Sequence, residues 1–549
     1  MRVLPKLGFV ILAAGMALAQ TDGGGQNQNV ADELKAMREA IATQQAQIAQ
    51  QQQRIQNLEQ QLVNKTAGTA HVADASLSTP AAPATAATTA SNTTVVQETE
   101  KPKESPLSFR IGGTEFTPGG FVDFENVFRS TNTASNLATN FGAIPFSNTV
   151  AGHLTEFRST GQYSRFNLKI TGTYGANKLT GYIEGDFNGN DAANVFVTSN
   201  PHTNRLRLYW LNLRRGNWEF LAGQSWGMQT PNRTGLSPAP SDLAVTLNED
   251  ANINVGIPYT RAGLFRTVYH FSDHFQWGAE IQNPDQFVAA GAVIFPFAFN
   301  AQLGTQFDAA NQTGAPNAFP DVHTKFAWDG DSGGKHYHWE AGGFLTSAKI
   351  TVLPTVLGAN FDHNTKIGGT FHSAFNFELA KGFRILANGM WGTGAGRYMI
   401  GLGPQAVVGL ANASGAICTG GTGCTATVSM VHSGALTIGS EIQAGKKSQF
   451  GFYYGGNYFQ RNAFLDITNP VPGRMAGFGG LNSPNSANRA IQEGTIDWTQ
   501  TFWRNPQYGA VLLVTQGSYV TRSPWFVPPG APKNAHLTMV FVSLRYALP

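Results

Sequence analysis

The sequence predicts an all-β fold, a transmembrane antiparallel β-barrel of about 16 strands, preceded by a short α-helical coiled coil. Three observations predict this fold. Apolar and polar residues alternate with a period of two from about Gly119 to the C-terminus, and short turns alternate there with long loops. The composition agrees, because only 13% of the 549 residues are charged and 62 are glycine, whereas soluble globular chains carry about 25% charged residues.

The overall charge and cysteine content exclude several classes of protein. The formal net charge is only +3, which offers no large basic field for nucleic acid. Two cysteines in so long a chain cannot form a disulfide framework. The mean hydropathy of −0.18 argues against a bundle of membrane helices.

Residues 1–19 have the pattern of a secretory signal peptide. Arg2 and Lys6 precede the apolar run Leu7 to Leu12, and the segment ends in small residues at Ala19. The alternative is an N-terminal membrane anchor, but a spanning helix needs about 20 apolar residues and this run is far shorter. An exported chain without membrane helices can still span a membrane by closing a barrel.

Residues 30–63 carry a heptad pattern. The apolar residues at seven-residue spacing are Leu34, Ile41, Ile48, Ile55 and Leu62. This register is typical of a coiled coil, and a single helix of this kind would leave its apolar seam exposed to water. We therefore expect an oligomer, and isoleucine at these positions favours a homotrimer. The alternative is a Gln-rich disordered segment.

Residues 64–108 are rich in Ala, Thr, Ser and Pro and contain almost no large apolar side chains. Such a segment cannot bury enough surface to offset the entropy of ordering, so it predicts a disordered linker. The barrel is then expected at residues 109–549.

Short and long connections alternate between the candidate strands. These strands are expected to begin near Gly119, Leu154, Lys178, Thr203, Trp218, Tyr259, His274, Pro320, Lys335, Thr365, Phe383, Gly434, Ser448, Ala487, Gln507 and Ala535. Links such as 272–273 are short, whereas links such as 227–258 are long, and strict alternation of the two is typical of outer-membrane barrels with both termini in the periplasm. We expect an extra hairpin or a packed loop at Val288 to Phe299.

The alternation of side chains assigns each residue to the inner or outer face. In residues 205–210, for example, we expect Leu206, Leu208 and Trp210 on one face and Arg205, Arg207 and Tyr209 on the other. The expected location is the outer membrane of a Gram-negative-type bacterium, in contact with its lipid. The coiled coil and the linker would then lie in the periplasm.

The order of signal peptide, coiled coil, linker and barrel resembles that of the DcaP-like family of trimeric outer-membrane porins. Residues 220–226 are similar to the strand before the family's long third loop, and Pro320 to Val322 are similar to a strand opening. Gly392 to Tyr398 are similar to its Gly-rich segment ending in Arg-Tyr. The resemblance covers nearly the whole chain and implies trimeric assembly and passive uptake of small anionic solutes such as carboxylates.

Charged side chains expected inside the barrel define the candidate site. The long loop 227–258, at the position from which porins usually fold a loop inward, carries Asp242, Glu249 and Asp250. The expected polar wall opposite carries Arg158, Arg165, Lys169, Arg205, Arg207 and Arg261, with Glu184 and Asp186 among them. Guanidinium groups bind carboxylates through paired donors, so we expect a charged constriction that favours small anionic solutes. The alternative for each basic residue is a solvated wall position balanced by a neighbouring acid.

Other chemical signals are weaker. Cys418 and Cys424 enclose a short Gly- and Thr-rich segment and are expected to form a disulfide, with a free redox pair as the alternative. His336, His338 and Glu340 should share one face of a strand, but two histidines facing water make a poor metal site, so we expect no metal and no cofactor.

No nucleophile elbow or metalloprotease pattern occurs, so we expect no enzyme activity. Two alternatives to a diffusion porin remain. One is a plugged barrel that tethers the outer membrane to the cell wall. The other is a barrel enzyme such as a phospholipase.

Overall fold

The computed structural model describes residues 105–549, except 136, 190–202, 237–242, 248–253, 290, 309–316, 354–359, 400–402 and 412–423. The predicted signal peptide, the coiled coil and the linker up to residue 104 lie outside the described residues and remain predictions. Among the described helices, none is long and apolar enough to cross a membrane.

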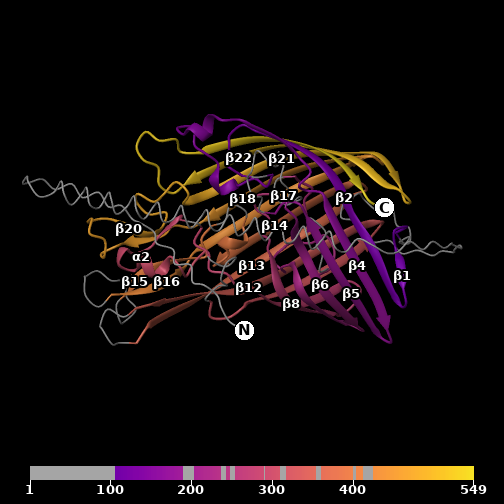
Figure 1. The fold of residues 1–549 in the computed structure, drawn as a ribbon, viewed down its shortest axis with the longest axis horizontal. Helices are drawn as coiled ribbons and strands as arrows, with labels where there is room; N and C mark the ends of the chain where they lie inside the picture. The colour runs from indigo at the N-terminus through magenta and orange to yellow at the C-terminus, as the bar shows by residue number, and fades with distance from the viewer. Residues whose placement is uncertain are drawn as a thin grey trace, which may run out of the picture. The chain divides into compact units, whose positions relative to one another are not determined.

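The described chain folds into a closed antiparallel barrel of 16 strands (Figure 1). The first half consists of β2 (Thr114–Arg129), β3 (Glu156–Thr160), β4 (Arg165–Tyr174), β5 (Asn177–Asp186), β6 (Arg205–Arg215), β7 (Trp218–Trp226), β8 (Arg261–His270) and β9 (Phe275–Gln282). The second half consists of β11 (Asp321–Ser332), β12 (Lys335–Val352), β13 (Asp362–Ala380), β14 (Phe383–Thr393), β17 (His432–Ala444), β18 (Ser448–Phe459), β21 (Asn488–Asn505), β22 (Gly509–Pro524) and β23 (Ala535–Ala547). Pairing of β23 with β2 closes the ring.

The predicted barrel is confirmed, including the alternation of short turns and long loops. β3 and β4 together occupy one strand position, because β2 pairs with β3 near Glu125 and with β4 near Phe121. The short β1 (Phe109–Ile111) forms a hairpin with the beginning of β2. The strand starts agree with the predicted ones to within a few residues, except that the second predicted strand is broken.

The break between β3 and β4 has a local cause. Gly120 has a φ of 131°, and a Cβ atom placed there would lie 2.0 Å from the Arg165 carbonyl oxygen, so only glycine allows β2 to bend here. Ser164 Oγ then accepts a hydrogen bond of 2.9 Å from the backbone N–H of Asp123. This side chain replaces the ladder partner that the interrupted strand cannot offer.

The outer face of the barrel is apolar. On β23, Val540 and Leu544 are exposed while Ser543 and Arg545 are buried on the inner side. Aromatic rings gather on the outer surface near the short turns, where Trp218 stacks on Phe220 and lies 4.8 Å from the Tyr269 ring. Such a surface fits the hydrocarbon and interfacial layers of a bilayer.

The predicted faces of β6 are partly wrong. The register shifts between Glu184 and Gly185 of β5, which pair with Leu208 and Leu206. This bulge adds one residue to β6 and reverses the alternation beyond it. Leu208 and Trp210 are therefore buried, and Tyr209 is exposed on the other face.

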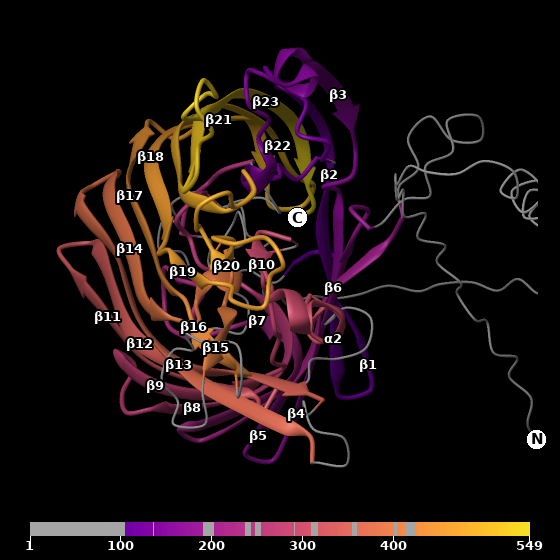
Figure 2. The ribbon, with the colours of Figure 1, turned by 90° about the vertical axis from the view of Figure 1, so that its left-hand side faces the viewer.

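The long loops carry short elements that cover the loop end of the barrel. They are η1 (Phe141–Ala143), η2 (Val150–His153), η3 (Phe297–Phe299), α2 (Asn300–Leu303), η4 (Gly396–Tyr398), the sheet of β10 (Val293–Ile294), β19 (Asn462–Leu465) and β20 (Met475–Phe478), and the hairpin of β15 (Ala406–Ala411) and β16 (Thr425–Met430). Viewed onto the loop end, both small sheets lie within the outline of the barrel strands (Figure 2). The loop expected at Val288 to Phe299 is thus a packed one.

Loop and wall residues form one apolar cluster in this half of the barrel. Phe141 and Ile144 of the first long loop and Leu247 and Val255 of the third are almost fully buried within it. The loops therefore fix one another and the inner wall, and they narrow the space available to a solute.

Candidate functional site

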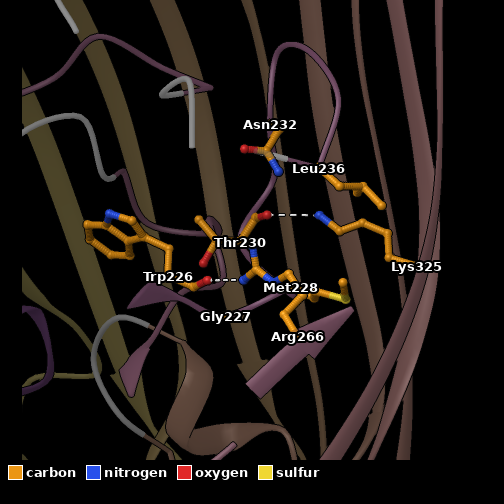
Figure 3. Close-up of a pocket in the computed structure, with 8 residues that line it drawn as sticks. All are labelled: Trp226, Gly227, Met228, Thr230, Asn232, Leu236, Arg266 and Lys325. Atoms are coloured by element: carbon orange, nitrogen blue, oxygen red, sulfur yellow. Dashed lines mark hydrogen bonds between the residues drawn. The ribbon is translucent and has the colours of Figure 1, made fainter. Parts of the chain in front are cut away.

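The loop of residues 227–260, here called the inward loop, follows the inner wall of the barrel from β8 onward. At its start, the Lys325 ammonium of β11 donates a hydrogen bond of 2.9 Å to the Thr230 carbonyl oxygen, and Arg266 of β8 donates to the Trp226 carbonyl oxygen (Figure 3). Glu280 of β9 accepts from the N–H of Met228 at 3.0 Å. These contacts tie the beginning of the loop to three neighbouring strands.

A small cavity lies beneath this first segment. Its volume is about 10 Å³, and its lining includes Thr230, Asn232, Arg266 and Lys325 (Figure 3). This space suits about one water molecule. It is too small for a solute, so no passage runs between the loop and this part of the wall.

The middle of the inward loop is held by a buried ion pair. Arg233 donates from Nη1 to Glu441 of β17 at 2.8 Å, and its Nη2 donates to the Leu243 carbonyl oxygen at the same distance. Both charged side chains are nearly inaccessible to solvent. Removal of one partner from such a buried pair lowers the free energy of unfolding strongly, because the other charge stays buried without compensation.

The return arm of the loop is bound to the opposite end of the same wall. The N–H of Val255 donates to Glu493 of β21 at 2.9 Å, and Asn388 of β14 donates to the Gly256 carbonyl oxygen at 2.8 Å. The N–H of Tyr259 donates to the Tyr398 carbonyl oxygen at 2.9 Å. The N–H of Leu247 donates to Gln516 of β22, so the described part of the inward loop is anchored from β8 round to β22.

A second loop segment supports this return arm. Tyr398 of η4 contacts Asp321 of β11 through its hydroxyl, which accepts a hydrogen bond of 2.5 Å from Gln282 of β9. Arg397 contacts the same aspartate. The segment similar to the Gly-rich family motif therefore runs from β14 across to β11, and it is not simply the end of a strand.

The predicted charged wall lies on β4, β5 and β6. Arg207 donates to Glu184 and to Asp186, each at 2.8 Å, and Arg205 binds Asp186 at 2.6 Å. The Arg165 guanidinium lies 3.7 Å from Glu184. The structure therefore brings these five predicted residues together in one network.

Lys169 lies on the same face of β4 and is half-buried. Among the described residues it makes no hydrogen bond or ion pair. Arg158 of β3 is exposed. The basic side chains of β3 and β4 thus keep surface that a solute can reach.

Other predicted site residues lie elsewhere. Arg261 begins β8, two strands away from β6, and its guanidinium lies 5.2 Å from the centre of the Trp226 ring at the base of the inward loop. Asp242, Glu249 and Asp250 lie outside the described residues, so their part in a constriction remains a prediction. Cys424 is disulfide-bonded, and Cys418 lies outside the described residues.

His336, His338 and Glu340 do share a strand, and each has a polar partner; His336 Nδ1 lies 3.0 Å from Asp331. His338 Nδ1 lies 2.8 Å from Asp329, and Glu340 accepts from the Lys325 ammonium at 2.8 Å. No cluster of three metal-ligating side chains occurs in the described part of the chain.

The sequence-based reasoning missed a further charged group at the barrel seam. Arg545 of β23 donates to Asp123 of β2 at 2.7 Å and lies 4.1 Å from the centre of the Phe121 ring. Arg165 lies over the same ring at 5.3 Å. The inward position of Arg545 was visible in the alternation, but its partner follows only from pairing of the first strand with the last.

Comparison with known proteins agrees with this architecture. No family model and no curated protein matches the sequence. Among solved structures, the chain is similar to the outer membrane channel DcaP of Acinetobacter baumannii, with a TM-score of 0.52 and 14% identity over 80% of this chain and 99% of that one.

Two further porins match more weakly. An anion-selective porin from Comamonas acidovorans gives a TM-score of 0.40 at 10% identity, covering 79% of this chain and 99% of that one. OmpF of Salmonella typhi, solved in complex with daunomycin, also gives 0.40 at 10% identity, covering 80% and 100%. The resemblance noted from the sequence is confirmed at the level of the fold, which is that of the DcaP channel.

Proposed function

We propose that this protein is an outer-membrane porin through which small hydrophilic anions, carboxylates above all, diffuse passively. The observation that carries the proposal is the asymmetry of the inner wall. The inward loop is fastened to the strands from β8 to β22, and the wall of β3 to β5 keeps accessible basic side chains at Arg158, Arg165 and Lys169. The passage would run between the loop and this wall.

The chemistry of the wall suits carboxylates. A guanidinium group offers two parallel donors to a carboxylate, and an ammonium adds a point charge. Glu184 and Asp186 lie within the same network and moderate the positive potential. Selectivity in such a channel follows from charge at the narrowest point, so we expect mild anion preference and no tight binding.

The expected assembly is a homotrimer. Its support is the heptad pattern of residues 30–63, which needs partner helices to cover its apolar seam. The coiled coil and the linker would lie in the periplasm, because the barrel termini lie at the short-turn end.

Single-channel recording in a planar bilayer under a salt gradient tests the proposal. Current steps in groups of three with an anion-directed reversal potential are expected for the full chain. The double variant Arg165→Gln, Lys169→Gln should shift the reversal potential toward zero without unfolding the barrel. Lys533→Gln, an exposed position in the loop between β22 and β23, is the matched control and should change nothing.

Folded, heat-modifiable protein that gives silent membranes would overturn the proposal. The alternative would then be a plugged barrel that acts as a tether, which the buried loop cluster in the barrel mouth favours.

A further inference from the structure

A pair of arginines lies at the loop end of three adjacent strands, away from the charged inner wall. Arg461 follows β18, Arg489 lies near the start of β21, and Trp525 follows the end of β22. The guanidinium carbons of Arg461 and Arg489 lie 5.7 and 5.9 Å from the centre of the Trp525 ring. Three strands thus contribute to one compact cluster.

The cluster continues an aromatic row on the outer face of the barrel. The Tyr458 ring meets the Trp525 ring nearly edge-on at 6.2 Å, and it stacks on the Trp391 ring at the same distance. Trp391 and Tyr458 are exposed on the face that alternation assigns to lipid. A Cβ atom at Gly434 would lie 2.3 Å from the Trp391 ring, so the glycine allows that ring to lie flat on the wall.

Trp525 itself is held in place. Its indole N–H donates a hydrogen bond of 2.9 Å to the Phe459 carbonyl oxygen, and the ring lies against Gly479. The aromatic platform under the two guanidinium groups is therefore fixed. When the plane of a guanidinium group stacks on an aromatic ring, the N–H groups along its edge remain available to a ligand.

Neither arginine is neutralised by the protein. Both side chains are exposed, and in the described chain neither forms a hydrogen bond or lies within ion-pair distance of a carboxylate. By contrast, several arginines of the inner wall are paired with acids, as Arg207 is with Glu184 and Asp186. Two uncompensated guanidinium groups above an apolar aromatic row are complementary to an anionic headgroup whose acyl chains lie along that row.

We propose that Arg461, Arg489 and Trp525 form a binding site for the phosphate group of a phosphorylated glycolipid in the outer leaflet. The phosphate would accept paired hydrogen bonds from the two guanidinium groups. The sugar would lie against Trp525, and the acyl chains would follow Tyr458 and Trp391 down the barrel wall. This inference rests on the proposed outer-membrane location but not on the conduction of solutes.

Native mass spectrometry of the full-length protein in detergent tests the site, with bisphosphorylated and dephosphorylated lipid A as probes. We expect the bisphosphorylated lipid to bind more tightly. The double variant Arg461→Gln, Arg489→Gln should weaken its binding roughly 10- to 30-fold and leave the dephosphorylated lipid unaffected. Arg474→Gln, an exposed arginine in the loop between β19 and β20, is the matched control.

Two further measurements keep the outcome interpretable. Arg461→Lys, Arg489→Lys retains the charge and should recover part of the affinity, and heat modifiability on gels verifies that each variant is folded. Equal binding of the two lipids, or an unchanged affinity in the glutamine variant, would overturn the proposal. Displacement of lipid A by inorganic phosphate at millimolar concentration would assign the site to the free ion. Unchanged channel conductance in the glutamine variant separates this result from a failure of the proposed porin function.

Discussion

Lys169 on β4 and Lys325 on β11 both point into the barrel, yet they occupy very different environments. Lys325 is fully buried between the Glu340 carboxylate and the Thr230 carbonyl oxygen of the inward loop. Lys169 is half-buried and has neither kind of partner in the described chain. The two lysines show that the same inward position is structural where the inward loop covers the wall and accessible where no described loop does.

The same contrast holds for the neighbouring inward-facing residues of the two strands. Inward-facing Asp321, His323 and Lys325 of β11 are all inaccessible, whereas every inward-facing residue of β4 keeps part of its surface. On the wall that the inward loop covers, Glu280, Glu340 and Glu441 are each paired with a basic side chain, so their charges weigh little on the wall of β4 to β6. Pairing, rather than the count of charges, determines which side of the lumen can select a solute.

The most disruptive test of this contrast removes the anchor of the covered wall. Arg233→Met leaves Glu441 buried and unpaired, which should lower the free energy of unfolding by about 3–5 kcal/mol. The inward loop should detach, and single-channel conductance should rise. Chemical unfolding and bilayer recording measure the two effects. The double variant Arg233→Met, Glu441→Gln should recover part of the stability, and a conductance equal to that of the parent would contradict the assigned role of the loop.

A smaller effect is expected at the second support of the loop. Tyr398→Phe removes the hydroxyl that joins Asp321 and Gln282, which should cost about 1–3 kcal/mol because buried polar partners lose their hydrogen bond. The return arm should then move more, and the open-channel current should become noisier in single-channel recordings. Tyr454→Phe, at an exposed position on the outer face, is the control. If both variants behave alike, the η4 segment does not hold the inward loop.

The next variant raises the positive potential of the open wall, which is the inner face of β4 to β6. Asp186→Asn removes the carboxylate that Arg205 and Arg207 share, so the positive potential along β5 and β6 should rise. We expect about a twofold increase in anion over cation permeability, in keeping with a charge change at the edge of the passage. The reversal potential under a salt gradient measures it. A shift toward cations would place the passage on the other side of the lumen.

The smallest expected effect concerns a loop carboxyl. Burial raises the pKa of Asp285, and the nearby Arg397 acts in the opposite direction. The folded state therefore holds this proton more tightly than the unfolded chain does, and stability should fall as pH rises from about 3.9 through the raised pKa. Asp285→Asn should be more stable than the parent at neutral pH and equal to it near pH 3. Thermal unfolding across pH measures this, with exposed Asp273→Asn as the control.

Much of the fold could be predicted from the sequence, because a barrel wall between lipid and water forces a period of two on every strand. The strand starts at Trp218, Lys335, Phe383, Ser448 and Ala535 agree with the structure to the residue. The exception within β6 has a physical cause, since the bulge opposite Gly185 depends on the partner strand. No pattern within β6 alone signals it.

The candidate site was predictable only in part. The network of Arg165, Arg207, Glu184 and Asp186 follows from alternation on neighbouring strands. The anchors of the inward loop do not, because each joins the loop to a distant strand, as Arg233 is joined to Glu441. Such pairs depend on the path of the loop through the lumen, which carries no periodic signal.

The seam between β2 and β23 has a consequence for assembly. Ser105 Oγ donates to the carbonyl oxygen of Pro549 at 3.1 Å across 444 positions of sequence, and Asp123 meets Arg545 across 422. Contacts of such sequence separation form late, because the entropy of closing the intervening chain must be lost first. Until β23 pairs with β2, Asp123 and Arg545 cannot form their ion pair. Closure of the ring and neutralisation of these two charges therefore form one cooperative step. Pairing of the last strand, β23, with β2 is therefore the step that completes the barrel.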